Sequence, residues 1–300
     1  MSGVEAVKDL IKPPFANYDI VVYFGCGLFS LPFTMHYIGD LRLSTTSFKF
    51  NIDPPFVSTL ITTLTVLFSV YILGHIIAYL GSQLIEKVMD SLFGKASLVI
   101  LRGTETNRDD FKKMMQQQIR LGISKHIEEA SWFSSIVRFV CHLPILPAYI
   151  AIYLLKVFGF YRTRISQDVI TAANGKVANA HIPEIKQGKE WFKSLEAVVM
   201  NTNPSATARM YNYLVISGLF RSVSIILLAS AWFELIYTIM KYKGYNAPEG
   251  LLMFGNNGIY AQSISYIAVC VVYLFSLFSY LKFQRRYVED AIFAFVYAKP

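Results

Sequence analysis

The sequence predicts an all-α membrane protein with about four transmembrane helices, and three observations lead to this expectation. Hydrophobic residues make up 54 % of the 300 residues and charged residues only 16 %, whereas soluble domains usually carry about 25 % charged residues. Several apolar stretches reach about 20 residues, the length that a helix needs to cross a bilayer. Lys and Arg are also spread unevenly over the segments between these stretches.

Five stretches are apolar enough to be considered as spans, and they cover residues 19–38, 56–80, 133–158, 213–240 and 259–281. The third stretch differs from the others because Arg138, His142, Pro144 and Pro147 lie in its middle. Proline lacks a backbone N–H and leaves carbonyl groups unpaired, which lipid cannot satisfy. We therefore expect the third stretch not to span the membrane.

The distribution of basic residues also favours four spans. With five spans the two sides of the membrane carry 14 and 12 Lys plus Arg, but without the third stretch they carry 22 and four. Basic residues collect in cytoplasmic loops, so both termini and residues 81–212 are predicted to be cytoplasmic. The stretch 133–158 then belongs to the core of a cytoplasmic domain, or lies on or dips into the membrane.

The predicted organisation has three parts. Residues 1–80 form an N-terminal tail and the first two transmembrane helices, residues 81–212 a basic helical cytoplasmic domain, and residues 213–300 the last two transmembrane helices and a C-terminal tail. Asn203 and Pro204 are a typical helix start, and nothing interrupts the helix from there to Met240. Its length of about 55 Å exceeds the bilayer core, so it is expected to protrude into the cytoplasm.

Shorter elements are predicted inside the cytoplasmic region. A helix over residues 83–93 continues the second span and stops at Gly94, and a helix over residues 166–173 ends near Gly175. Residues 108–120, 124–133 and 191–200 also favour helix, while the run 97–101 is compatible with a strand.

The second span carries hydroxyl groups on one face. Ser58, Thr62, Thr65 and Ser69 follow spacings of four, three and four residues, which align on a helix. One interpretation is the wall of a water-filled pore. The other is close helix packing, since small and hydroxylated residues are common where membrane helices touch.

Charged residues in the helix over 213–240 are the next candidates. Ser217, Arg221 and Ser224 share a face, and an arginine that lines a passage favours anions. The alternative is that Arg221 reaches the cytoplasmic head groups, as long basic side chains do near helix ends. Glu234 lies near the other end of the helix and is expected at the membrane interface.

Aromatic residues form a stripe in the last span. The tyrosines recur every seven residues, at Tyr266, Tyr273, Tyr280 and Tyr287. Such spacing is typical of packing against a neighbouring helix, and a stacking surface for a ligand is the alternative.

No sequence motif of a known catalytic class is present. The chain has no HExxH, GxSxG, Walker or dinucleotide-binding pattern, and its three cysteines form no CxxC pair. We therefore predict no catalytic residue, no cofactor and no metal site. The region 81–212 carries 17 Lys plus Arg against 11 Asp plus Glu, which suits a nucleotide or oligonucleotide or, alternatively, a solvated face beside anionic lipid. The candidate ligand-binding residues are Lys112, Lys113, Arg120, Lys125, Arg162 and Arg164.

This layout of four spans, a basic cytoplasmic insert and no catalytic motif resembles small bacterial membrane effectors of antiphage defence. The resemblance implies a bacterial inner membrane protein, activated on the cytoplasmic side by a nucleotide, an oligonucleotide or an activating protein, that then permeabilises the membrane. Four spans of one chain cannot enclose a wide conduit, so several copies are expected to assemble around an axis. The expected function is a homo-oligomeric, anion-conducting channel or pore-forming effector gated by its cytoplasmic domain. The alternatives are an anchor or adaptor for a partner protein and a membrane enzyme with an unrecognised site.

Overall fold

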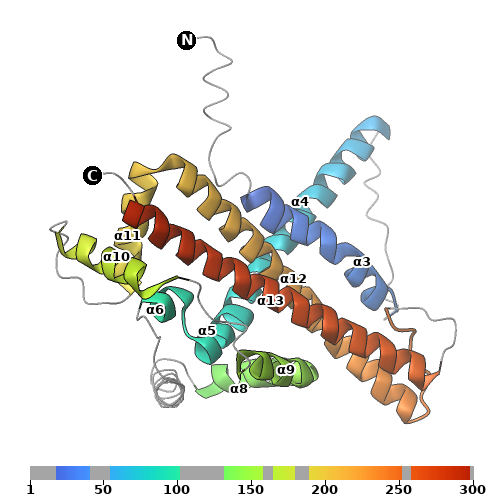
Figure 1. Ribbon diagram of the computed structural model, residues 1–300. Helices are drawn as coiled ribbons and strands as arrows, with labels where there is room; N and C mark the ends of the chain where they lie inside the picture. Colours follow the sequence, from blue (N-terminus) through green and yellow to red (C-terminus); the bar gives the residue numbers. More distant parts are fainter. Residues whose placement is uncertain are drawn as a thin grey trace. The chain divides into compact units, whose positions relative to one another are not determined.

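A computed structural model describes residues 18–40, 55–101, 132–157, 165–179, 189–251 and 258–297 of the chain (Figure 1). These residues form helices joined by turns and short connections, and none of them is in a β-strand. The all-α fold class is therefore confirmed.

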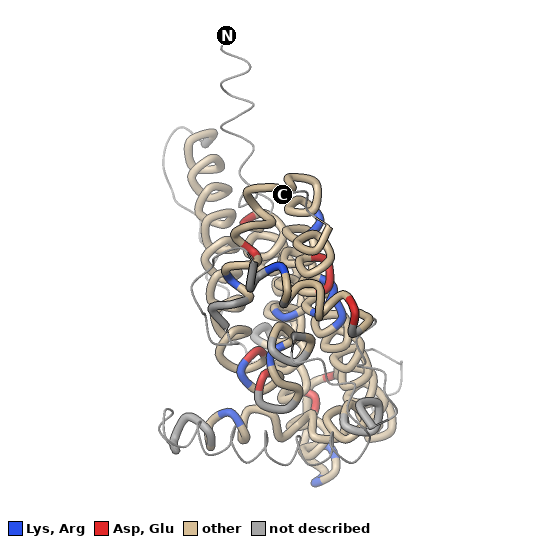
Figure 2. Tube along the Cα trace, turned by 60° about the vertical axis from the view of Figure 1, so that its left-hand side comes forward, with Lys and Arg blue, Asp and Glu red and all other residues tan. Residues whose placement is uncertain are grey.

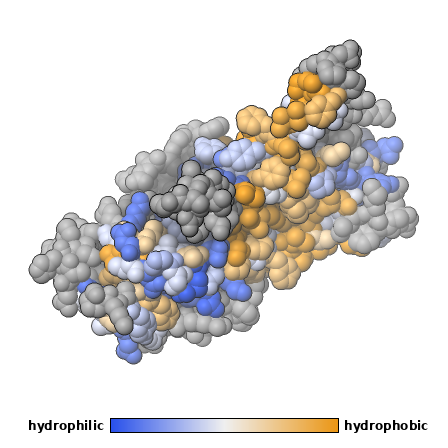
Figure 3. All heavy atoms as spheres, turned by 90° about the horizontal axis from the view of Figure 1, so that it is seen from above, coloured by the Kyte–Doolittle hydropathy of each residue, from blue (hydrophilic) through white to orange (hydrophobic). Residues whose placement is uncertain are grey.

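Four helices are long and apolar enough to cross a membrane, and they cover Asp19–Tyr37, Phe56–Asp90, Pro204–Tyr242 and Ile259–Tyr297. Figure 2 shows long parts of the Cα trace without a charged residue. In Figure 3 hydrophobic side chains gather over a broad region of one face. An apolar surface of this extent indicates contact with lipid, and the chain is a multi-pass membrane protein.

The first two spans are each assembled from more than one helical segment. The first combines the π-helical turn η1 (Asp19–Phe24) with α3 (Gly25–Asp40), and the second combines α4 (Pro55–Gly81), η2 (Ser82–Glu86) and α5 (Lys87–Phe93). α5 ends at Gly94, whose φ of 74° favours glycine. The predicted continuation of the second span and its stop at Gly94 are confirmed.

The first two spans cross with their backbones in close contact. A Cβ atom added to Gly74 would lie 1.8 Å from the carbonyl oxygen of Tyr23, and one added to Gly27 would lie 2.0 Å from the carbonyl oxygen of Val70. The rings of Tyr23 and His75 stack at this crossing, with their centroids 3.7 Å apart. Only glycine permits such an approach, which is typical of small-residue contacts between membrane helices.

The proline-containing stretch is broken in the middle, as expected. It forms α8 (Trp132–Cys141) and α9 (Leu146–Val157), which the 3₁₀ turn η3 (Leu143–Ile145) separates. Neither half is long enough to cross a bilayer as one helix, which supports four spans over five.

The chain divides into two compact units that are described separately. Unit 1 contains residues 1–85, 141–152 and 218–277, and unit 2 contains residues 86–140, 153–217 and 278–300. The chain passes from unit 1 to unit 2 after residue 85 and from unit 2 to unit 1 after residue 217, close to the predicted domain boundaries. The sequence left open whether residues 141–152 belong with the spans or with the cytoplasmic domain, and it did not predict that residues 278–300 join unit 2.

Unit 2 has a hydrophobic core built from segments that are far apart in the sequence. They are α6 (Ala96–Leu101), α10 (Gln167–Asn179), α11 (Lys189–Thr202), the first turns of α12 (Pro204–Tyr242) and the last turns of α13 (Ile259–Tyr297). The buried core side chains include Ile100, Ile170, Leu195, Val199, Met210, Ile292 and Phe295. Tyr287 donates a hydrogen bond to Glu196, and Lys176 Nζ donates to the carbonyl oxygen of Phe295 at 2.9 Å. These bonds attach α13 to α11 and α10.

Two local expectations in unit 2 were wrong. The run 97–101 lies in the helix α6 instead of a strand, because Ile100 is buried in the core and a short apolar run has no periodicity that separates helix from strand. α10 passes through Gly175 and continues to Asn179. A single glycine in an exposed helix position costs only about 1 kcal/mol, which is too little to end this helix.

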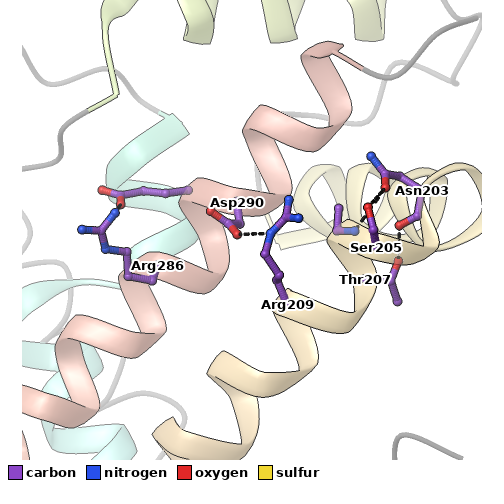
Figure 4. Close-up of polar contacts among 8 residues, drawn as sticks. Asn203, Ser205, Thr207, Arg209, Arg286 and Asp290 are labelled. Atoms are coloured by element: carbon purple, nitrogen blue, oxygen red, sulfur yellow. Dashed lines mark hydrogen bonds and ion pairs between the residues drawn. The ribbon is translucent and has the colours of Figure 1, made fainter. Parts of the chain in front are cut away.

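The long helix α12 begins as the sequence predicts. The Asn203 side chain caps it by accepting a hydrogen bond from the backbone N–H of Ala206, at 3.1 Å (Figure 4), which is the usual role of asparagine at this position. Arg209 forms an ion pair with Asp290 of α13, with the Nε–Oδ2 distance at 3.3 Å. α12 has 39 residues and is therefore about 58 Å long.

The tyrosine stripe of α13 packs within one chain. In unit 1, Tyr266 donates a hydrogen bond to the carbonyl oxygen of Pro144, and the Tyr273 hydroxyl lies 3.3 Å from that of Tyr149. In unit 2, Tyr280 is buried and Tyr287 bonds to α11. The packing interpretation is confirmed, because the four tyrosines are buried or hydrogen-bonded inside one chain.

Candidate functional site

The most polar cluster of unit 1 surrounds the carboxylate of Glu234, which is 0 % exposed. Its Oε1 accepts hydrogen bonds from the Tyr37 hydroxyl of α3 at 2.9 Å and from the backbone N–H of Leu251 at 2.6 Å. Its Oε2 accepts one from Gln262 Nε2 of α13 at 2.7 Å. Three donors from three separate segments therefore converge on one buried carboxylate.

The cluster is closely packed. A Cβ atom on Gly250 would lie within 3.0 Å of Glu234 Oε2, Gln262 Nε2 and Ser265 Oγ, so a larger residue there would have to displace these polar groups. The ring of Phe233 stacks on Tyr37 with the centroids 4.6 Å apart. Through these hydrogen bonds the cluster fastens α3, α12 and α13 together at one end.

Sequence reasoning placed Glu234 near the end of its span and missed the cluster around it. A signal was present, because Tyr37, Glu234 and Gln262 are hydrogen-bonding residues in three apolar runs. In a four-span arrangement all three lie toward the same side of the membrane. Polar residues at matching depth in different spans favour a shared contact.

The predicted hydroxyl face lies on a side of α4 that is exposed or partly buried within the chain. Thr65 and Ser69 are exposed, and Ser58 and Thr62 are partly buried. Three of these hydroxyls donate to carbonyl oxygens one turn back along α4, as Thr65 Oγ1 does to Ile61 at 2.8 Å. Such a face is compatible with lipid, water or a neighbouring helix, so the pore-lining role of these residues stays a prediction.

Arg221 lies near the ends of two other spans. Its Nη2 donates to the Tyr18 hydroxyl at 3.4 Å, and its Cγ atom would lie 3.2 Å from a Cβ on Gly81. Tyr18 directly precedes the first span, and Gly81 is the last residue of α4. In a four-span arrangement both positions lie toward the same side of the membrane, and that this side is the cytoplasmic one stays a prediction.

The serines predicted to share the face of Arg221 are buried. Ser224 is 0 % exposed and its hydroxyl lies 3.0 Å from that of Ser276 in α13. Ser217, in unit 2, is 4 % exposed. Within one chain Ser224 belongs to the contact between α12 and α13, and the pore-lining role predicted for both serines is not tested.

The predicted ligand-binding residues lie outside the described part of the chain. This holds for Lys112, Lys113, Arg120, Lys125, Arg162 and Arg164. Among the described residues, no group of three or more His, Cys, Asp or Glu side chains is arranged to hold a metal ion.

Comparison of the chain with protein-family models, with curated proteins and with solved structures finds no match. Fold and geometry therefore define the chain as an all-α multi-pass membrane protein with four spans and a buried, fully hydrogen-bonded carboxylate between three of them.

Proposed function

We propose that the chain forms a homo-oligomeric ion channel, with α4 lining the conducting path and unit 2 controlling its opening. The observation that carries the proposal is the surface of the second span. Only 6 % of the residues in its apolar window are buried within the chain, against 61 % in α12 and 44 % in α13. Most of the surface of this helix is therefore available for contact with a second copy of the chain.

The hydroxyl face is well placed for such a contact. Thr65 and Gly74 are nine residues apart, which is about two and a half helical turns, so Thr65 lies opposite the crossing with α3. Hydroxyl faces of several copies around one axis would form a polar wall. Their oxygen atoms keep lone pairs that can accept hydrogen bonds from water.

Charge and connectivity support the rest of the proposal. Arg221 contacts α4 at Gly81, which lies on the same face as Gly74, so in this proposal its charge favours anions from the cytoplasmic entrance and not from the wall that Thr65 lines. α12 and α13 each have residues in both units, so a rearrangement of unit 2 acts on helices that also belong to the spans.

The proposed activator is a nucleotide, an oligonucleotide or an activating protein that binds the basic residues of 81–212. The proposed location is the bacterial inner membrane, with both termini in the cytoplasm. The proposed role is antiphage defence, because the chain shares its layout with effectors of that kind. No cofactor is proposed.

Cross-linking between subunits tests the assembly. Thr65→Cys places a thiol on the hydroxyl face, and its neighbour Leu64→Cys, which is also exposed, points about 100° away. We expect oxidation in the membrane to give cross-linked dimers of the Thr65→Cys protein and few of the Leu64→Cys protein. Equal cross-linking of the two variants would reject the α4-lined oligomer. So would the absence of cross-linking in a protein that is also a monomer in mild detergent, and this result would favour an anchor for a partner protein.

A further inference from the structure

The break between α8 and α9 leaves backbone groups that need partners outside the helix. Pro144 and Pro147 have no N–H to donate, and the N–H of Ile145 donates to the carbonyl oxygen of His142 at 3.1 Å. The N–H of Ile145 would otherwise be the α-helical partner of the Cys141 carbonyl. In water such a carbonyl is solvated, but in hydrocarbon it is costly unless protein satisfies it.

Side chains of the spans donate to carbonyl oxygens of this break, including that of Cys141. Trp232 Nε1 of α12 donates to the carbonyl oxygen of Cys141 at 2.9 Å. Tyr266 of α13 donates to the carbonyl oxygen of Pro144, and Cys270 Sγ lies 3.9 Å from the same atom. Capping of a broken helix by neighbouring helices is the condition under which irregular backbone is tolerated inside a bilayer.

These donors come from the interior of their spans. Trp232 is eight residues from Met240, and Tyr266 is seven residues from Ile259, which corresponds to about 12 Å and about 10 Å along the helices. Tyr273, which lies beside Tyr149 of α9, is deeper still. Since a bilayer core is about 30 Å thick, the segment 141–152 meets the spans at the depth of the hydrocarbon.

The segment has two faces, and both are apolar. Ile145, Ala148 and Ile152 are at most 5 % exposed and pack inside unit 1. Leu146 and Ile150 are 41 % and 63 % exposed. No residue between 141 and 152 is an Asp, Glu, Lys or Arg.

The last span also presents an apolar surface. The exposed side chains of α13 in unit 1 include Ile264, Ile267, Val271, Val272 and Phe275. Lipid is the occupant that matches this surface, because the same helix crosses the membrane.

We propose that residues 141–152 form a re-entrant membrane segment, whose exposed side chains contact lipid chains and whose open carbonyls are capped by α12 and α13. The segment enters and leaves on the cytoplasmic side, because four spans place residues 81–132 and 156–212 on the same side of the membrane. The inference rests on the four-span arrangement and is independent of the channel function.

Fluorescence quenching tests the lipid contact. Ile150→Cys is made in a Cys141→Ser background and labelled with bimane, and the protein is reconstituted in vesicles of phosphatidylcholine with or without brominated acyl chains. Phe275→Cys on the lipid face of α13 is the positive control. Asn246→Cys, at an exposed position between the last two spans, is the negative control.

We expect the label at Ile150 to lose fluorescence in brominated lipid to the same extent as the label at Phe275, and to be insensitive to iodide in the buffer. Quenching by iodide, as for Asn246, would overturn the proposal by placing the segment in water. Protection from both quenchers would overturn the lipid contact in favour of a second copy of the chain. Accessibility of Asn174→Cys from outside the cell would overturn the re-entrant path while leaving lipid contact possible.

Discussion

Replacing Glu234 by alanine removes the one acceptor that three donors share, two of them buried and one partly buried. The donors are the Tyr37 hydroxyl, the Leu251 N–H and Gln262 Nε2, at 2.6 to 2.9 Å from the carboxylate. Each donor left without a partner costs about 1–3 kcal/mol. Removing the buried charge itself regains part of its desolvation cost. With three neutral donors left unpaired and part of the desolvation cost regained, we expect Glu234→Ala to lower the free energy of unfolding by about 3–5 kcal/mol.

Glu234→Gln separates the effect of the charge from that of the hydrogen bonds. Its Oε1 still accepts from Tyr37 and Leu251, and its new amide group faces the amide of Gln262. Gln262 can turn its amide over, because its Oε1 is buried without a hydrogen-bond partner in the described residues. Only the extra strength that the charge gives these hydrogen bonds is then lost, so we expect Glu234→Gln to lower the free energy of unfolding by about 1–2 kcal/mol.

Equilibrium unfolding in mixed detergent micelles measures both variants. Thr238→Ala is the matched control, since its hydroxyl donates only to the Glu234 main-chain carbonyl, at 2.7 Å, and its loss is expected to cost about 0.5 kcal/mol or less. If Glu234→Ala destabilises the protein no more than Thr238→Ala does, the carboxylate does not hold α3, α12 and α13 together.

Two further predictions concern helix packing and topology. Gly74→Ala is expected to destabilise the protein by about 1–3 kcal/mol, because its methyl group would overlap the carbonyl oxygen of Tyr23. Gly175→Ala is the control: its methyl group would meet no atom within 4 Å, and it is expected to stabilise the protein by about 0.5–1 kcal/mol. Equal effects of the two variants in thermal unfolding would contradict the close crossing. Cysteines at Ser44 and Asn246 should react with an impermeant maleimide added to intact cells and one at Asn174 should not, and labelling of Asn174 would restore the five-span arrangement.

The sequence predicts the elements whose causes are local. Length and hydropathy suffice for the four spans, the prolines for the break after α8, and the Asn203 cap for the start of α12. Each depends on residues within a few positions, so no knowledge of the tertiary structure is needed. Gly94 ends the second span for the same reason.

The contacts between distant segments are not predictable in this way. Glu234 looks interfacial in its own helix, and only the positions of Tyr37 and Gln262 in other spans make it a buried acceptor. Ile100 joins the core of unit 2, where α6 packs against α11 about 90 to 100 positions later in the chain, and this contact turns an ambiguous apolar run into a helix. Trp232 looks like an ordinary membrane tryptophan until the Cys141 carbonyl is placed beside it.

Chloride flux through reconstituted protein tests the channel most directly. Many copies are placed in each vesicle so that rare spontaneous openings are recorded, and flux and ion selectivity are compared with protein-free vesicles. The account predicts chloride permeability, retained in Arg221→Lys and lost or replaced by cation permeability in Arg221→Glu, because the charge at this position sets the local potential for permeating ions. Absence of ion flux from well-folded protein, or unchanged selectivity in a well-expressed Arg221→Glu variant, would contradict it.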